Sequence, residues 1–281
     1  MECYHCGSTH FSRYAAHEKC EFLRCCHCSL IFQNPIPNSK EIELFYNSYY
    51  SSVHQSSPSE NSRRSKAYKL DLSFIEKAVR DIGLDHFCIT SCFDFGASGG
   101  QFLYEIGNFV TYRRGWDYGT EAKCELMRKD YYEDPFAETG EGYDLLVLRG
   151  VIEHLVEPYE TISKVISSKQ PRSILISATP NGSSVAYNIY RDKWRMHLPT
   201  EHIWQFSCHH FVEMLASKGF VTTDIAFQYL DSPYANQLQD CIEVYDMCRL
   251  RNSQEYIQCT KSPPYFDSMI TLFAVQREVL V

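Results

Sequence analysis

The chain has no long apolar run, no excess of basic residues, and no basic segment followed by an apolar one near its start. None of its apolar runs reaches the roughly 18 residues that a membrane-spanning helix needs. The opening residues, MECYHCGSTH, do not resemble a secretory signal. A formal net charge of −8 argues against a protein that binds nucleic acid mainly through electrostatics. We therefore expect a cytoplasmic protein that makes no membrane contact and does not take nucleic acid as its main partner.

The cysteines do not form a disulfide framework. There are 13 of them, an odd number, and several lie in segments that read as core strands or helices, such as Cys88, Cys92, Cys124 and Cys208. A secreted disulfide scaffold would show an even set at regular spacings. Reduced thiols in the cytoplasm fit this pattern better.

Four N-terminal cysteines form a separate pattern of two C-x-x-C pairs separated by 18 residues; they are Cys3, Cys6, Cys25 and Cys28. Two such turns can place four thiolates at the corners of a tetrahedron around Zn²⁺, and this spacing is typical of zinc sites. A closed four-thiolate shell has no open position, so the predicted zinc is structural. Gly7 follows the first pair and would relax its turn, whereas Ser29 stands where a second glycine is common.

Other potential ligands lie in the same segment: His5, Cys20, Cys26 and His27. We favour the two C-x-x-C pairs because both keep the two-residue spacing. A bound zinc ion would also stabilise about 35 residues that are too few to form a core of their own.

The 281 residues, of which 44% are hydrophobic, allow one α/β domain and a small module. We predict a zinc ribbon over 1–33, a helix and Ser-rich linker or lid over 34–68, and an α/β domain over 69–281. In the second segment, Asn38 or Ser39 would cap a helix from Lys40 to about Asn47, and SSVHQSSPSENSRRS reads as the flexible linker. The next helix begins near Lys66 and ends at Gly83.

Strand and helix patterns alternate after residue 87, which predicts a parallel sheet with helices on both faces. The predicted strands are 87–95, 109–117, a weak one near 130–133, 143–149, 173–178, 220–229 and 268–277. The predicted helices are 99–106, 120–129, 158–168 and one that ends at Gly219. A helical insert at about 231–265 precedes the last strand.

The segment CFDFGASGGQFL joins the first strand of this domain to a helix through a glycine turn. Such a turn lets the backbone approach a ligand closely and can present N–H groups at a helix N-terminus to a cofactor. A dinucleotide-binding fold would need G-x-G-x-x-G, and the series from Gly96 to Gly100 misses that register. It also leaves Asp94, two residues before the first glycine, without a role.

The motif DFGASGG resembles the first motif of the class I S-adenosylmethionine-dependent methyltransferases, with Ser98 replacing the middle glycine. GWDYGTEA, YDLLVLRGVIEHLVEPYETI and SILISATPN look like the family's second, fourth and fifth strands with their flanks. The chain is similar to a subgroup with an N-terminal zinc ribbon, an NPIP-like turn, an EHL segment, and a later W…EH…FS segment. All of these motifs are present, and only the 231–265 insert lies outside the resemblance.

The resemblance implies a Rossmann-like seven-stranded methyltransferase sheet and S-adenosylmethionine as cofactor. Gly96, Ala97 and Gly100 would approach the amino acid part of the cofactor. Asp94 would orient the loop or reach the ammonium through water, although a capping role at the strand end fits it as well. Asp117 would accept hydrogen bonds from the ribose hydroxyls, because a carboxylate suits a vicinal diol.

Two further cofactor contacts are expected. Tyr118, next to Asp117, would pack on the adenine. Asp134 would meet the adenine amino group, with Glu133 as its rival.

For proton removal from a hydroxyl acceptor we expect His154 to be the general base, because an imidazole titrates near neutral pH. Glu153 could orient it, and His202 is a second candidate. Many relatives carry an acid where this chain has Arg149-Gly150, which removes one alternative base. The two histidines could also bind a metal, but the sequence shows no third ligand at convincing spacing.

The segment from Asn181 to Trp204 is expected to line the acceptor pocket. Its aromatic rings and guanidiniums suit a sugar or a phosphate group; they belong to Tyr187, Tyr190, Arg191, Trp194 and Arg195. Taken singly, each could equally be a core aromatic or a solvated arginine.

Some relatives methylate sugars, often nucleotide-linked, or small metabolites, at oxygen or carbon. We therefore expect a methyltransferase that acts on a hydroxyl or carbon of a small molecule, in particular a sugar or nucleotide sugar. One alternative is an RNA methyltransferase that grips its substrate with the ribbon, but SRRSK is the only compact basic cluster. The other is a non-catalytic scaffold. The presence of the expected cofactor residues argues against it; they are Asp94, Gly96, Gly100 and Asp117. The sequence leaves the oligomeric state open.

Overall fold

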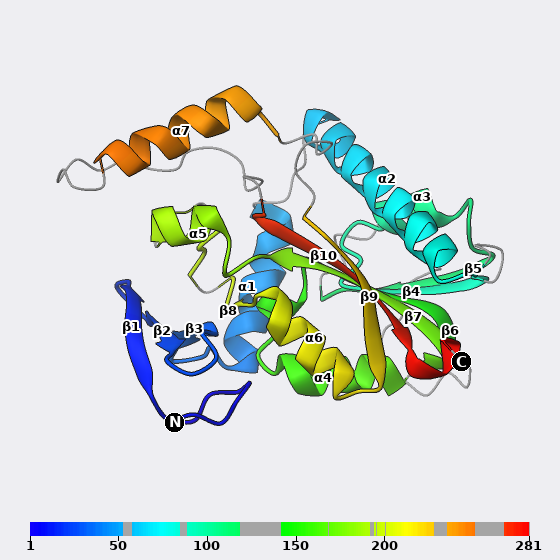
Figure 1. Cartoon of the computed structure of the whole chain (residues 1–281), viewed down its shortest axis with the longest axis horizontal. Helices are drawn as coiled ribbons and strands as arrows, with labels where there is room; N and C mark the ends of the chain where they lie inside the picture. The colour runs from blue at the N-terminus through cyan, green and yellow to red at the C-terminus, as the bar shows by residue number, and fades with distance from the viewer. Residues whose placement is uncertain are drawn as a thin grey trace.

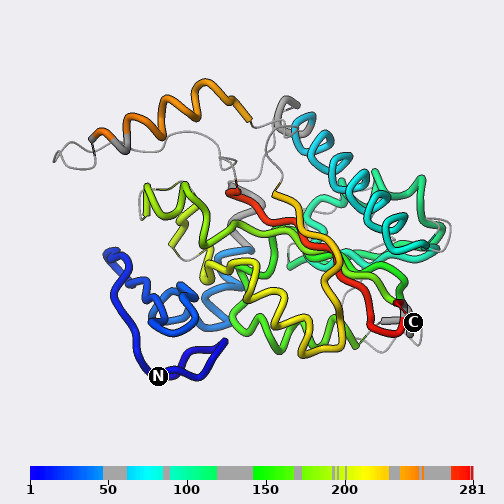
Figure 2. Tube along the Cα trace, viewed as in Figure 1, coloured from blue at the N-terminus to red at the C-terminus, as the bar shows by residue number. Residues whose placement is uncertain are grey.

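The computed structural model describes residues 1–52, 58–84, 89–118, 142–167, 169–191, 194, 196–199, 201–227, 235–250 and 267–280. Two sheets dominate this part of the chain, a large one in the α/β domain and a small one at the N-terminus (Figure 1). The N-terminus lies beside the small sheet, and the C-terminus lies at the far side of the large one (Figure 2). No described helix is both long enough and apolar enough to cross a membrane.

The large sheet has the strand order β5-β4-β6-β7-β10-β9. Its strands are β4 (Ser91–Phe95), β5 (Tyr112–Trp116), β6 (Tyr143–Arg149), β7 (Lys169–Pro180), β9 (Phe220–Ala226) and β10 (Met269–Gln276). The first four run parallel, and β10 is antiparallel to both β7 and β9. This mostly parallel sheet confirms the predicted α/β class. The strand predicted near 130–133 and the helix predicted over 120–129 lie outside the described residues.

Alternate residues of β6 face the two layers of helices that cover the sheet. Leu145 and Val147 pack with the inner face of α2 (Pro58–Asp81) and with α3 (Gln101–Ile106). Leu146 and Leu148 pack on the other face, with α4 (Pro158–Ser167) and α6 (Cys208–Ala216). A strand buried on both faces is apolar along its buried part, which is why the centre of YDLLVLR, from Leu145 to Leu148, is a continuous apolar run.

The segment expected to be a Ser-rich linker is largely helical. Helix α1 spans Ser39–Ser52, longer than predicted, and α2 already begins at Pro58 rather than near Lys66. Pro58 is a helix start signal, because proline is favoured in the first turn of a helix. The serine-rich composition around it hid this signal in the sequence. Of the two predicted capping residues, Asn38 caps α1: its Oδ1 accepts from the N–H of Lys40 and of Glu41, 3.0 Å each.

The small sheet joins the N-terminal ribbon to a distant segment. It has the order β1-β2-β3-β8, all antiparallel, with β1 (Phe11–Ala16), β2 (Glu21–Cys25), β3 (Ile31–Asn34) and β8 (Trp204–Gln205). The indole N–H of Trp204 donates to the carbonyl of Leu155 at 2.6 Å. The ribbon is therefore built into the α/β domain and does not hang from it as a separate unit.

The remaining described elements are short helices and part of the insert. They are η3 (Ile152–His154), α5 (Val185–Tyr190), α7 (Gln237–Leu250) and η5 (Arg277–Val279). Helix α7 falls within the predicted helical insert and contacts α5.

Candidate functional site

The parallel strands β4, β5 and β6 end at the same edge of the large sheet. The glycine loop follows β4, Asp117 follows β5, and the Glu153–His154 pair follows β6. The carboxyl ends of parallel strands are where α/β folds bind ligands. The topology thus brings together three predicted site segments that are far apart in sequence.

The glycine loop needs its glycines for backbone conformation and for packing. Gly96 has φ 84° and Gly100 has φ 77°, and Ser98, which replaces the middle glycine, also has a positive φ of 48°. A Cβ added at Gly96 would lie 2.2 Å from Cγ2 of Val151, the residue that precedes η3. Glycine at position 96 therefore lets the loop pack directly on the segment that carries Glu153 and His154.

The N–H groups of this loop are largely used inside the protein. Those of Gly96 and Ala97 donate to the carbonyl of Trp116 at 2.7 and 2.9 Å, and that of Gly100 donates to Ala97. The expectation that this turn presents its N–H groups to a cofactor is therefore wrong for these residues. The loop can still contact a ligand closely, through its carbonyl oxygens and its bare Cα atoms.

Asp117 is attached to the glycine loop. Its Oδ2 accepts a hydrogen bond of 2.8 Å from the N–H of Ser98, and the side chain is buried. Gly115, two residues earlier, is not among the predicted site residues. A Cβ at this position would lie 2.9 Å from Cβ of Ala97 and 2.6 Å from Cδ1 of Leu103. Gly115 lets β5 approach the loop, and only the spatial pairing of β4 with β5 reveals this.

Asp94 lies under the loop with a side chain that is 2% exposed. Burial raises the pKa of this carboxyl to about 7, partly opposed by the positive charge of Arg149. Arg149 forms an ion pair with Asp71 of α2 and stacks over the ring of Tyr68 at 4.5 Å. The arginine that departs from the family's pattern thus connects the end of β6 to α2.

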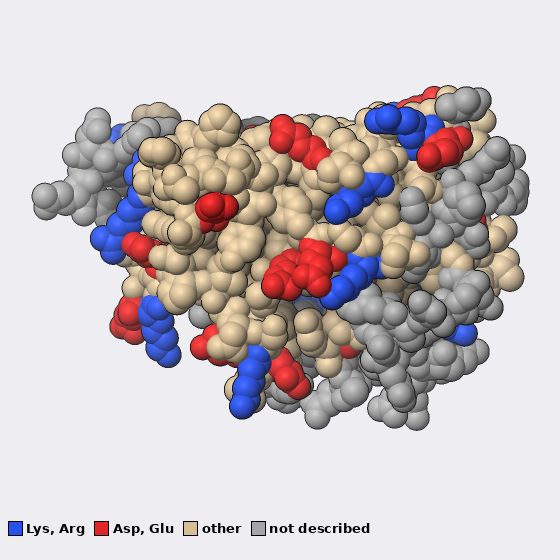
Figure 3. Space-filling model, turned by 90° about the horizontal axis from the view of Figure 1, so that it is seen from below, with Lys and Arg blue, Asp and Glu red and all other residues tan. Residues whose placement is uncertain are grey.

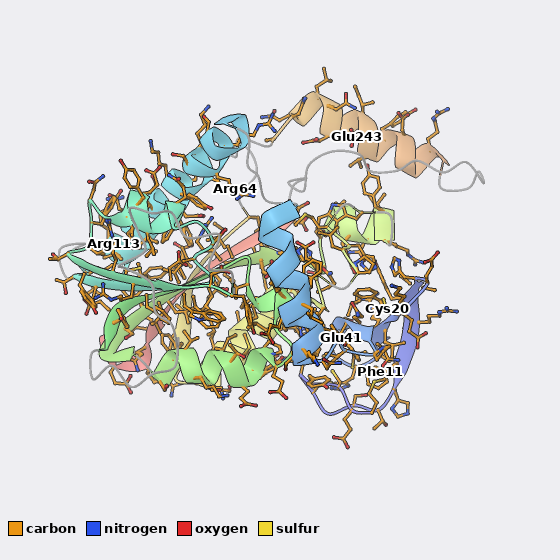
Figure 4. The ribbon with its side chains drawn as sticks, turned by 180° about the vertical axis from the view of Figure 1, so that it is seen from behind. Phe11, Cys20, Glu41, Arg64, Arg113 and Glu243 are labelled. Carbon is orange, nitrogen blue, oxygen red and sulfur yellow. The ribbon has the colours of Figure 1, made fainter. Side chains whose placement is uncertain are left out.

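Helix α1 crosses the carboxyl edge of the sheet (Figure 4). Its Tyr46 contacts two of the predicted site residues. The Tyr46 ring stacks on that of Tyr118, with centroids 5.7 Å apart and planes 10° apart. It also meets the His154 ring edge-on at 6.2 Å. One face of Tyr118 is therefore covered by Tyr46, so the predicted packing on adenine would use the other face.

Glu153, His154 and His202 form one cluster. The rings of the two histidines are 4.6 Å apart, and Nε2 of His154 lies 3.7 Å from Oε1 of Glu153. One potential ligand atom from each of the three lies within 4.8 Å of those of the other two. The sequence shows no third ligand at convincing spacing for the two histidines, and the structure corrects this by bringing Glu153 to them.

Burial shifts all three protonation equilibria in the cluster towards neutral groups. It raises the pKa of Glu153 to about 7 and lowers that of His202 to about 4. Burial, together with the neighbouring His202, lowers the pKa of His154 well below its usual range. His154 is therefore a neutral imidazole at pH 7.

The ribbon helps to position this cluster. His202 precedes β8, whose pairing with β3 places it beside the ribbon. The N–H of Gln33 donates to the carbonyl of Ile203 at 2.9 Å, one residue from His202. The N-terminal module thereby holds one of the three site residues in place.

The four predicted zinc ligands converge in the ribbon. The Sγ–Sγ distance is 3.6 Å both for Cys3 and Cys28 and for Cys6 and Cys25, and all four sulfurs lie within 4.8 Å of one another. Four thiolates at the usual Zn–S distance of about 2.3 Å are about 3.8 Å apart, so this donor set fits zinc. The rival ligands are not part of this cluster.

The aromatic residues expected to line the acceptor pocket belong to the core instead, whereas Arg191 of the same segment is exposed. The three aromatic residues, Tyr187, Tyr190 and Trp194, are fully buried against Phe22 and Ile31 of the ribbon. Aromatic rings suit a hydrophobic interface as well as a sugar, and here the ribbon covers them. Arg195 and Asp134 lie outside the described residues.

Comparison with known proteins identifies the fold. The sequence model of a family described as "Methyltransferase domain" matches residues 57–225. The structure is similar to that of magnesium protoporphyrin IX methyltransferase from Synechocystis PCC 6803 with bound SAH, at 14% identity and a TM-score of 0.52, covering 83% of this chain and 99% of that one.

A second solved structure shares the fold, a chain in the complex between the Haloferax volcanii Trm112 methyltransferase activator and a methyltransferase. It is 12% identical with a TM-score of 0.51, covering 82% of this chain and 96% of that one. The sequence matches none of the curated proteins.

Proposed function

Because this chain belongs to the class I S-adenosylmethionine-dependent methyltransferases, we propose that it transfers a methyl group to an oxygen or carbon of a small molecule, in particular a sugar or nucleotide sugar. The observation that carries the proposal is the shared sheet edge. There the glycine loop and Asp117 lie beside the Glu153–His154–His202 cluster. A cofactor site and a cluster able to handle protons are thus neighbours.

The cofactor would bind where β4 and β5 end. Gly96, Ala97 and Gly100 allow close approach of the backbone. The Asp117 carboxylate, which accepts from the N–H of Ser98, would also accept hydrogen bonds from the ribose hydroxyls. Asp94 would orient the loop or reach the ammonium through water. Tyr118 would contact the adenine with the ring face that Tyr46 does not cover.

The acceptor would lose its proton at the Glu153–His154–His202 cluster. The Nδ1 of His154 lies 2.9 Å from the carbonyl of Glu201, and a carbonyl only accepts, so Nδ1 carries the hydrogen and Nε2 keeps a lone pair. That lone pair can take a hydroxyl proton as the methyl group moves. Glu153, 3.7 Å from Nε2 of His154, would help to orient this ring, and His202 is the second candidate base.

A small acceptor fits this site better than RNA. Glu153 and His202 are buried, and His154 keeps only 16% of its side chain exposed. Helix α1 crosses the same edge, which restricts access. On the face shown in Figure 3, Lys and Arg stand among Asp and Glu and form no continuous basic surface.

We propose that Cys3, Cys6, Cys25 and Cys28 bind structural zinc. The four thiols leave no position for a substrate, and the ribbon they hold together carries the strand that positions His202. These thiols must stay reduced to bind metal, which agrees with the expected cytoplasmic location.

Calorimetric titration with S-adenosylmethionine, S-adenosylhomocysteine and, as control, NADH tests the proposal. We expect micromolar binding of the first two and none of the third. The variant Asp117→Asn should bind roughly 10–100-fold more weakly, because charge-assisted hydrogen bonds of about 1.5–3 kcal/mol are lost. Tyr118→Phe, which retains the ring, is the matched control. Unchanged affinity in Asp117→Asn would refute the ribose assignment.

The second stage screens nucleotide sugars as acceptors by mass spectrometry. His154→Gln should retain cofactor affinity while the transfer rate falls by about 10²–10⁴-fold, the usual contribution of a general base. Transfer at the wild-type rate in this variant would show that another group takes the proton.

A further inference from the structure

We infer that Glu153, His154 and His202 bind a divalent first-row transition-metal ion, at an open site distinct from the thiol cluster of the ribbon. The inference starts from the convergence of the three side chains, one potential ligand atom from each lying within 4.8 Å of the others. It rests on the proposed function only for the identity of the metal's external ligand. It changes one role in that function, because an ion bound to Nε2 of His154 would occupy the lone pair assigned to the general base. With the ion bound, the acceptor's hydroxyl would lose its proton because coordination to the metal lowers its pKa.

The hydrogen bonds of the two histidines prepare both rings for a metal. The Nδ1 of His154 lies 2.9 Å from the carbonyl of Glu201, and the Nδ1 of His202 lies 2.7 Å from the carbonyl of Met196. Since a carbonyl oxygen only accepts, both rings carry hydrogen on Nδ1, and both keep an Nε2 lone pair. Donation of the other ring N–H to a carbonyl is the usual second contact of a metal-bound histidine.

Glu153 is held in a similar way. Its Oε2 accepts a hydrogen bond of 2.9 Å from the hydroxyl of Thr179, at the carboxyl end of β7. Its Oε1 faces Nε2 of His154 at 3.7 Å, which is too long for a hydrogen bond. Ligands bound at about 2.0–2.2 Å to one ion are roughly 3.0–3.5 Å apart, so small movements would bring both onto a metal.

The surroundings of Glu153 favour a positive ion. Its side chain is 3% exposed, and its neighbours Ile152 and Leu155 are buried apolar residues. Within the part of the chain that the structure describes, its only ion-pair partner is His154 at 3.7 Å. A buried carboxylate is usually paired or bound to a metal. A bound cation would satisfy this one.

The donor set selects the class of metal. Two imidazoles and one carboxylate suit zinc, iron, manganese and related ions, whereas an all-oxygen site would suit magnesium or calcium. Three protein ligands leave positions open, unlike the four thiolates of the ribbon. His154 keeps 16% of its side chain exposed, so an oxygen of the acceptor could reach the ion.

Metal content of the full-length protein tests the inference without cofactor or acceptor. After equilibrium dialysis against Zn²⁺ and removal of loosely bound ions, elemental analysis should find two ions in the wild type and one in His202→Gln and in Glu153→Gln. An exposed ribbon histidine, changed in His10→Gln, is the control and should keep two. Cobalt substitution separates the sites, because only thiolate ligands give intense sulfur-to-metal charge-transfer bands.

A graded variant distinguishes a metal site from a buried polar cluster. Thr179→Val keeps the side-chain shape but removes the hydrogen bond to Glu153, and it should weaken the second ion's binding by about 10–100-fold while leaving the ribbon ion unchanged. One ion in the saturated wild type, or two ions in both ligand variants, would overturn the inference and leave a hydrogen-bonded cluster with His154 as base. Failure of the S-adenosylmethionine titration would refute the proposed function and would not affect these counts.

Discussion

Two regions of this protein gather side chains of the types that can bind metals, and they do so in different ways. The ribbon brings four thiols together from two short turns, so each pair is already close along the chain. The sheet edge joins Glu153 and His154 to His202, which comes from a segment that pairs with the ribbon. The first arrangement is closed and suits a structural ion, whereas the second is open and lies beside a cofactor loop. The comparison shows that local spacing predicts a scaffold site more readily than a reactive one.

The largest expected effect comes from breaking the ribbon cluster. Cys25→Ser should release the ribbon zinc and unfold much of the ribbon, because structural zinc sites contribute apparent binding energies of about 10–16 kcal/mol. The loss should spread, since His5 of the ribbon contacts Tyr159 of α4 at 2.6 Å and Glu213 of α6 at 2.9 Å. Zinc content and thermal unfolding measure both effects.

The adjacent thiol gives the control for this variant. Cys26 is exposed and lies outside the cluster, so Cys26→Ser should retain zinc and stability. Equal zinc loss in both variants would mean that the ligands have been assigned wrongly.

A pH-dependent effect is expected at the sheet edge, at Asp94. Burial raises the pKa of this carboxyl to about 7 in the folded state, against its ordinary value of 3.8. As pH rises, the Asp94 carboxyl loses its proton in the unfolded chain before it does so in the folded protein. The free energy of unfolding should therefore fall between about pH 4 and 7 and then level off.

Asp94→Asn removes this titration. Relative to the wild type, the variant should gain stability from pH 5 to pH 8 by a few kcal/mol at most, since each pKa unit corresponds to about 1.4 kcal/mol. Urea unfolding at the two pH values measures the difference, and the exposed carboxylate changed in Glu278→Gln serves as the control. A difference that stays constant with pH would show that Asp94 is ionised in the folded protein.

The glycine loop gives a smaller effect through packing. Gly96→Ala should lower stability by about 1–3 kcal/mol, because φ is 84° and the new Cβ would lie 2.2 Å from Cγ2 of Val151. It should also weaken cofactor binding in calorimetry. The double variant Gly96→Ala/Val151→Ala should recover the part of the lost stability that is due to the clash with Val151. If no stability is recovered, the whole loss comes from the backbone conformation at position 96.

The smallest effect is expected back in the ribbon, at its two matching turns. Ser29 has φ 68° where Gly7 has φ 72°. Ser29→Gly should raise stability by up to about 1 kcal/mol, since a left-handed conformation strains a residue with a Cβ. Gly7→Ser should lower it by a similar amount, and thermal unfolding of both variants compares the turns directly. Opposite signs are expected, and equal signs would contradict the equivalence of the turns.

Much of the fold followed from local patterns. The alternation of apolar strands and amphipathic helices predicted the mostly parallel sheet, and the capping residue Asn38 was anticipated. The early start of α2 was not predicted, because a serine-rich composition resembles a linker even where Pro58 begins a helix. The aromatic residues Tyr187 and Trp194 were misassigned to the acceptor pocket, since nothing in their local sequence says that the ribbon covers them.

The same division applies to the site. Each C-x-x-C pair lies within a few residues, so a short turn is enough to bring its two thiols together. The glycine motif is equally local, and its positive φ angles form the close-packed turn. Other features of the site depend on strand pairing between distant segments. The carbonyl of Trp116 accepts from the loop's N–H groups, and position 115 needs glycine, because β5 pairs with β4. Glu153 meets His202 because β8 pairs with β3. Sequence order does not reveal such contacts, because burial and sheet pairing form them only when the whole chain has folded.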